Sequence, residues 1–188
     1  MTEKTVLLTT SRRPTKNMRT FCKDFSHSIP NVIRTNRGKL SLDGVAEKAL
    51  ELNLKKVIIV DRWKGGPGKL KFFEVTEKGL NVLPPTVYIR SVKLRRDFGN
   101  MPRGRRVKSV SIKELHGSLD VQKLGKAFSE FFEIPILSLR EAANRGFDAL
   151  MEIADEANCI NLTFRLIPEL IEVGPQLKIS HLIWESAK

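Results

Sequence analysis

The 188-residue sequence has little that would support metal, disulfide or cofactor chemistry. It has two cysteines, Cys22 and Cys159, which lie far apart and form no Cys-x-x-Cys pair. The three histidines, His27, His116 and His181, have no cysteine or carboxylate neighbours at metal-ligand spacing. The sequence therefore predicts no zinc site, no disulfide framework and no cofactor, and both cysteines are expected to be buried as small apolar residues.

The sequence also predicts no membrane-spanning helix and no secretory signal. No apolar run reaches the roughly 18 residues that a membrane helix needs. The start, Met1 to Lys4, lacks the basic and then apolar pattern of a secretory signal. Hydrophobic residues make up 41% of the chain, which is enough to build a core. We expect a cytoplasmic, globular and monomeric protein with no membrane partner.

Positive charge is the property that the sequence has in excess. The formal net charge is +12, and it is unevenly distributed. Residues 1–40 carry nine Lys or Arg against two acids, an excess of +7, and residues 90–108 carry eight against one, again +7. Charge that served only solubility would be spread along the chain, so the two blocks favour a surface directed at a polyanion such as RNA.

The first basic block surrounds a predicted strand-to-helix junction. The apolar run 6–8 predicts a buried strand, residues 9–11 predict a turn, and Pro14 suits the first position of a helix. That helix has one apolar face, made of Met18, Phe21, Cys22, Phe25 and Ile29. We predict an anion site at its N-terminus, where free N–H groups meet Arg12, Arg13, Lys16 and Arg19. The alternative is that these four charges form a solvated rim.

Further elements follow along the chain from periodicity, caps and turn residues. The pattern predicts strands at 31–35, 57–60, 70–75, 86–92, 107–112, 160–167, 169–173 and 177–184. It predicts helices at 42–52 with Ser41 as cap, at 119–132 with Ser118 as cap, and over much of 139–157 with a break at 144–146. Residues 65–68 are expected to be a hairpin loop. Residues 95–106 have little to bury and predict an exposed basic loop.

The order of these elements repeats, which predicts an α/β fold of two similar halves related by a pseudo-twofold axis. The halves are residues 1–94 and 107–188, with the basic loop 95–106 between them. In this alignment Phe25 corresponds to Phe128, and Ile59 to Leu162.

Four motifs together resemble the Brix domain superfamily of ribosome-biogenesis proteins over nearly the whole chain. They are the opening Thr10-Ser11-Arg12-Arg13-Pro14-Thr15-Lys16, the turn Asn36-Arg37-Gly38, the segment Pro85-Thr86-Val87-Tyr88-Ile89, and the closing Glu172-Val173-Gly174-Pro175-Gln176-Leu177-Lys178-Ile179. The compact length is similar to that of the archaeal version, and the start most resembles the member found in the small-subunit processome. The resemblance implies a single Brix domain over 1–188, two halves that are each similar to an anticodon-binding domain, and binding to ribosomal RNA precursor.

The expected function is an RNA-binding ribosome assembly factor that is not an enzyme. Its candidate RNA contacts are the cations of the two basic blocks: Arg12, Arg13, Lys16, Arg19, Arg34, Arg37, Lys39, Arg95, Arg96, Arg103, Arg105 and Arg106. The alternative is a scaffold whose acidic second half docks ribosomal or assembly proteins. A metal-dependent nuclease is disfavoured, because Glu141, Asp148, Glu152, Asp155 and Glu156 are expected to form the solvated face of one helix.

Overall fold

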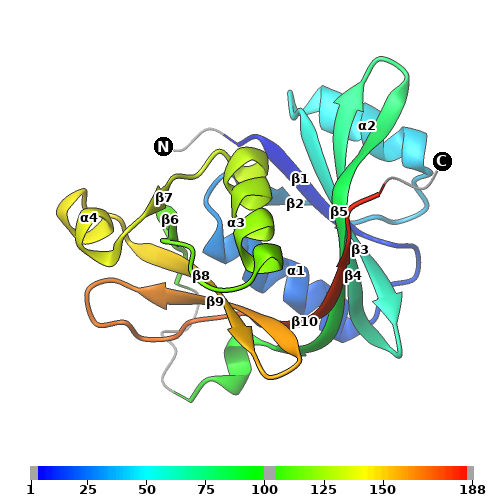
Figure 1. The fold of residues 1–188 in the computed structure, drawn as a ribbon. Coiled ribbons are helices and arrows are strands. Elements are labelled where there is room, and N and C mark those ends of the chain that lie inside the picture. Colours follow the sequence, from blue (N-terminus) through cyan, green and yellow to red (C-terminus); the bar gives the residue numbers. More distant parts are fainter. Residues whose placement is uncertain (1–3, 100–104, 186–188) are drawn as a thin grey trace.

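The computed structural model describes residues 4–99 and 105–185, and a ten-stranded mixed sheet forms its centre (Figure 1). The strands are β1 (Val6–Thr10), β2 (Val32–Arg34), β3 (Lys56–Trp63), β4 (Gly66–Thr76), β5 (Gly79–Lys93), β6 (Val110–Lys113), β7 (Ile136–Leu137), β8 (Ala149–Glu156), β9 (Cys159–Leu166) and β10 (Gln176–Ile183). The helices are α1 (Lys16–Ser28), α2 (Leu42–Glu51), α3 (Leu119–Phe132) and α4 (Leu139–Asn144), with a 3₁₀ turn, η1, at Arg95–Asp97.

The strands lie in the order β2-β1-β3-β4-β5-β10-β9-β8-β6-β7. In the first half β1 runs parallel to β2 and β3, and in the second half β6 runs parallel to β7 and β8. The other neighbours are antiparallel, including β5 and β10, which join the two halves at the middle of the sheet. Each half therefore uses the same chain order of strand, helix, strand, helix and three further strands.

One face of the sheet carries α1 and α3, and the main core lies beneath them. Alternate residues of each strand point to opposite faces, so Leu8 and Ile58 join this core while their neighbours do not. The two helices also contact each other, since the rings of Phe25 and Phe132 lie with their centroids 6.1 Å apart. Both rings are fully buried, so the two halves share one hydrophobic core.

The opposite face of the sheet carries the other two helices, α2 and α4. Helix α2 packs through Val45 and Ala49 on Val57 and Phe73 of the first half. The short α4 packs through Ala142, next to Leu137 and Leu150. Figure 1 shows these two helices at far ends of the molecule.

The N-caps of two helices were predicted correctly. Ser41 and Ser118 cap α2 and α3, each accepting a hydrogen bond from a backbone N–H of the first turn. The prediction for Pro14 was wrong, because Thr15 is the N-cap of α1 and Pro14 precedes it. Cys22 is buried as expected, whereas Cys159 is half-buried.

The predicted helix over 139–157 is correct up to the break at 144–146 and wrong beyond it. Helix α4 ends at Asn144, and residues 149–156 form strand β8 between β6 and β9. Ala149, Met151 and Ile153 are buried at every second position, which is the period of a strand. The counterpart of β3 in the order of elements is therefore β8, so the predicted correspondence of Ile59 with Leu162 of β9 does not hold.

Two smaller predictions also differ from the structure. The predicted strand at 169–173 is a turn with a single bridge between Arg165 and Glu172. The hairpin loop predicted at 65–68 is shorter, because β3 continues to Trp63 and β4 begins at Gly66. No helix in the described part of the chain is both long and apolar enough to cross a membrane.

Candidate nucleic-acid interface

The N-terminus of α1 is surrounded by exposed cations. β1 ends at Thr10, the chain turns through Arg13 in a left-handed conformation (φ 55°), and Thr15 caps the helix by accepting a 3.3 Å hydrogen bond from the Met18 N–H. Arg12, Arg13, Lys16 and Arg19 are all exposed here. Arg19 donates to the Pro14 carbonyl at 2.9 Å, which holds its side chain over the turn.

The charge at this helix start opposes the helix dipole. Within residues 4–99 and 105–185, the other three α-helices each carry an acid in the first turn, namely Asp43, Asp120 and Glu141. Helix α1 has none there and begins instead with Lys16. Cations near the positive end of a helix are unfavourable unless an anion is present, so this arrangement is well suited to hold a phosphate.

The loop after β2 joins the same surface. Arg12 reaches the carbonyls of Lys39 and Leu40 at 3.5 Å, which brings the first basic cluster against the 36–40 turn. Arg34 and Lys39 are exposed as expected. Arg37 is not: it is only 6% exposed, and it donates to the carbonyls of Leu40 (2.8 Å) and Thr10 (3.3 Å). Arg37 therefore fixes the turn.

The expectation of a fully exposed basic loop over 95–106 is wrong at Arg95. This side chain is 8% exposed and donates to Ser28 Oγ at 2.7 Å, to the Gly174 carbonyl at 3.2 Å and to the Arg105 carbonyl at 2.6 Å. Its backbone N–H donates to the buried Asp24 carboxylate at 2.9 Å. Burial raises the pKa of Asp24 and lowers that of Arg95. Arg95 thus connects α1 to the start of β10.

The other arginines of this segment have different surroundings. Arg96 is exposed and donates to Asn17 Oδ1 at 3.0 Å, so η1 lies beside the first turn of α1. Arg105 is exposed but paired with Asp148 at 2.9 Å, and Arg106 is exposed. Arg103 lies outside the described residues. The structure therefore brings Arg96 to the cations at the N-terminus of α1.

A second positive region lies at the C-terminal end of α1. The Val107 N–H donates to the His27 carbonyl at 2.8 Å, which places the 105–107 segment there. Burial together with the charge of Arg106, and after it those of Arg95, Lys23 and Arg34, lowers the pKa of His27 to about 4. Burial is the larger cause of this shift, and the four cations add to it, so the region around His27 carries positive charge.

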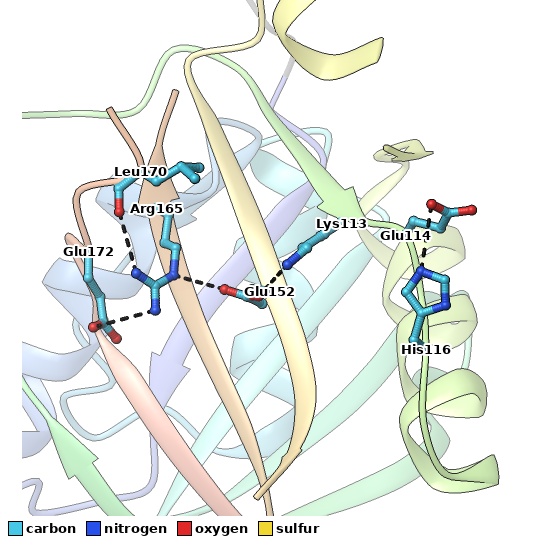
Figure 2. A network of polar contacts seen from close by, with 7 residues as sticks. All are labelled: Lys113, Glu114, His116, Glu152, Arg165, Leu170 and Glu172. Carbon is cyan, nitrogen blue, oxygen red and sulfur yellow. Dashed lines mark hydrogen bonds and ion pairs between the residues drawn. The ribbon is translucent and has the colours of Figure 1, made fainter. Parts of the chain in front are cut away.

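The acids of the second half are engaged in pairs. Glu152 receives hydrogen bonds from Lys113 (2.6 Å) and Arg165 (2.8 Å), and Arg165 also reaches Glu172 (Figure 2). Burial acts to raise the pKa of Glu152, but the two hydrogen-bonded cations outweigh it and the pKa is lowered.

These acids do not lie on one helix as expected, because Glu141 is in α4 while Glu152 is in β8. Within the described residues, no group of three or more His, Cys, Asp or Glu side chains could hold a metal ion.

A cleft next to the basic surface was not predicted from the sequence. It has a volume of about 550 Å³ and lies between the β3–β4 hairpin, β5 and η1. Its lining includes Trp63, Lys64, Arg90, Arg96 and Asn17. The strand predicted at 57–60 stopped three residues before Trp63, so the prediction left Trp63 outside the sheet and did not indicate this cleft. Trp63 lies between Arg62 and Lys64 in the sequence, and an aromatic residue flanked by cations is the pattern that could have indicated this site.

Two archaeal proteins of similar sequence carry the same description. A probable Brix domain-containing ribosomal biogenesis protein of Pyrococcus horikoshii is 30% identical over 156 residues, covering 81% of this chain and 66% of the relative. A protein of the same description from Aeropyrum pernix is 28% identical over 176 residues, covering 92% of this chain and 93% of the relative. No protein-family model matches the chain.

Solved structures agree with this likeness. A probable ribosomal biogenesis protein from Aeropyrum pernix K1 superposes with a TM-score of 0.78 at 24% identity, over 94% of this chain and 95% of that one. Mil, an archaeal Imp4-like protein, gives a TM-score of 0.66 at 19% identity, over 95% of this chain and 99% of that one. The fold is therefore the mixed α/β fold of these structures, with one large sheet and, among residues 4–99 and 105–185, four α-helices. The chain belongs to the Brix domain superfamily.

Proposed function

We propose that this protein is a ribosome assembly factor that binds ribosomal RNA precursor through the surface around the N-terminus of α1 and assists RNA folding or processing without catalysis. The observation that carries the proposal is the set of exposed cations Arg12, Arg13, Lys16 and Arg19 at a helix start that has no acid in its first turn. The printed names of the relatives, ribosomal biogenesis proteins, support the same role.

The surface suits an RNA backbone for electrostatic reasons. Lys39 from the 36–40 turn and Arg96 from η1 extend the four cations on both sides, through contacts with Arg12 and Asn17 respectively. Phosphate contacts of this kind supply affinity and orientation but no sequence information. The surface should therefore select RNA by shape or by unpaired segments.

Docking of proteins by the acidic second half is less favoured. Asp148, Glu152 and Glu156 are each paired with a cation of the chain itself, and Asp155 accepts from Ser118. The three acids that are paired with cations have little net charge to offer a basic partner, and Asp155 is held by Ser118. Within the same proposal, ribosomal or assembly proteins are partners of other surfaces.

We also propose that the two halves of the sheet are related by symmetry. A pseudo-twofold axis between β5 and β10 would relate residues 1–94 to 107–188 within one Brix domain, with each half similar to an anticodon-binding domain. The identical chain order of the two halves supports this relation. Superposition of the two halves of a crystal structure is the direct test. We also propose that the protein acts as a monomer in the cytoplasm.

The test is RNA binding by matched charge variants. Arg12→Ala/Arg13→Ala should weaken binding to structured ribosomal RNA precursor and lower the slope of log affinity against log salt by about 1.5, since each lost phosphate contact removes about 0.7 to 0.9. The control, Arg140→Ala/Arg145→Ala, removes two exposed arginines of the distant α4 region and should leave the slope unchanged. Equal slopes for the two double variants would refute the proposal, as would cleavage of the RNA on addition of magnesium.

A further inference from the structure

The tip of the β3–β4 hairpin holds a tryptophan in an exposed position. Lys64 and Gly65 form the two-residue turn, both with positive φ (48° and 84°), which is the tight geometry preferred between antiparallel strands. Trp63, the last residue of β3, is 58% exposed. A large aromatic side chain at this tip leaves much apolar surface in water, so it is a candidate contact for a flat partner.

A bulge in the adjoining strand sets the position of this tryptophan. The register shifts after Asp61, so that Arg62 pairs with Pro67 and Gly68 is left without a partner. A Cβ at Gly68 would lie 1.9 Å from the Trp63 Cβ and 2.9 Å from its Cα. Only glycine therefore allows the two strands to approach here. Bulges commonly redirect a side chain next to a functional site.

The tryptophan borders the cleft of about 550 Å³ described above. That volume is within the range of sites for small ligands. Lys64, Arg90 and Arg96 supply three cations to its lining, against one acid, Asp97, among the lining residues described. The cleft therefore combines an aromatic surface with an excess of positive charge.

Further cations and rings continue from the tryptophan across the sheet. The Lys69 ammonium lies over the Trp63 ring at 5.7 Å from its centroid and over the Tyr88 ring at 4.8 Å. Tyr88 in turn stacks on His181 at 4.2 Å, with 18° between the ring planes. Lys69 occupies one face of the indole, so a partner would stack on the other.

We propose that this cleft binds an unpaired nucleotide of a single-stranded RNA segment, with the base stacked on Trp63 and the adjoining phosphates held by Lys64, Arg90 and Arg96. This inference rests on the proposed function and specifies the form of RNA that is bound. Bases inside an A-form duplex are already stacked on one another, so an indole platform selects unpaired bases. Arg96 also contacts Asn17 at the start of α1, which makes the cleft continuous with the phosphate-binding surface.

The first measurement is intrinsic fluorescence. The chain has two tryptophans, so Trp184→Phe leaves Trp63 as the only indole reporter. A short oligouridylate should quench the fluorescence of this variant on binding, while a blunt-ended RNA duplex with the same number of nucleotides should bind without quenching. Saturation by the oligouridylate with no change in Trp63 fluorescence would overturn the inference.

The second measurement is affinity. Trp63→Ala should weaken oligouridylate binding by about 5- to 100-fold, because one base–aromatic stack is lost, and should leave duplex binding nearly unchanged. Trp63→Phe retains a ring and should recover most of the affinity. Equal weakening of oligouridylate and duplex binding would show that Trp63 is not a stacking platform.

These results separate the inference from the proposed function. If Trp63→Ala binds oligouridylate as tightly as the wild type while Arg12→Ala/Arg13→Ala still weakens precursor binding, the stacking site is refuted and the RNA-binding surface stands. If the wild-type protein binds neither structured precursor nor oligouridylate, both are refuted.

Discussion

The guanidinium of Arg95 donates a 2.7 Å hydrogen bond to the hydroxyl of Ser28, and both groups are buried. The Ser28 hydroxyl also lies 2.8 Å from the Gly174 carbonyl, which Arg95 contacts as well. One cation therefore holds together the last turn of α1, the segment after β5 and the approach to β10. Arg95 is in the second basic block of the sequence, yet its contacts are those of a structural residue.

Arg95→Ala should lower the free energy of unfolding by about 2–3 kcal/mol, because it leaves buried hydrogen-bond partners unsatisfied. The salt slope of RNA binding should not change. Arg96→Ala is the matched control: Arg96 is adjacent but exposed, so its stability should change by less than about 0.5 kcal/mol while its salt slope falls. Urea denaturation and salt titration of both variants make the comparison, and a stable Arg95→Ala would contradict the structural role.

Arg105 and Arg106 should contribute unequally to RNA binding. Arg105 is paired with Asp148 at 2.9 Å, so a phosphate must compete with that carboxylate. Arg106→Ser should therefore lower the salt slope by about 0.7–0.9, and Arg105→Ser by clearly less. The pair is matched in residue type, exposure and position. A larger effect for Arg105 would mean that the ion pair with Asp148 opens in the complex.

His27 should report phosphate binding at the C-terminal end of α1. Its pKa is about 4 in the free protein, through burial and the nearby charge of Arg106. Because the unfolded chain has the ordinary value near 6.5, it takes up the proton first, and stability should fall as the pH drops from about 6.5 to about 4. Histidine proton NMR should show the pKa rising when RNA binds and in Arg106→Ser. A value that does not move with RNA would place the phosphates elsewhere.

Glu152→Gln should destabilise the second half of the sheet. Glu152 accepts from both Lys113 and Arg165, and these contacts lower its pKa, so its stabilising effect is present at neutral pH and is lost as the pH falls through the lowered value. We expect a loss of about 1–2 kcal/mol at pH 7, because hydrogen bonds to a charged group are replaced by weaker neutral ones. The variant should also lose less stability on acidification than the wild type. Thermal melts at neutral and acidic pH measure both effects, and parallel pH profiles would rule out this role.

Much of the fold follows from short-range signals in the sequence. The serine caps Ser41 and Ser118 depend on a few adjacent residues, so the starts of α2 and α3 were predicted closely. Strand β8 was not, because the run 139–157 is rich in good helix formers. Its conformation is decided by β6 and β9 on either side, which lie outside any local window.

The exposure of the basic side chains was predicted for most of the cluster but not for each residue. Arg12, Arg13, Lys16 and Arg19 flank a helix start and are exposed, as their local pattern indicates. Arg37 and Arg95 have similar sequence neighbours but are buried by carbonyls and hydroxyls from other segments. Only the tertiary structure distinguishes an exposed cation, which can contact a partner, from a buried cation that stabilises the fold.

The pairing of β5 with β10 has a consequence for synthesis of the chain. The first five strands of the sheet order belong to residues 6–93, but the free edge of β5 is paired only by residues 176–183. At about 5–20 residues per second, translation of the intervening segment takes on the order of 5–20 seconds. A newly made chain therefore exposes a long, unpaired strand edge for that time. Such an edge is a template for pairing with other chains, so the nascent protein is most prone to aggregation just before its last strand emerges.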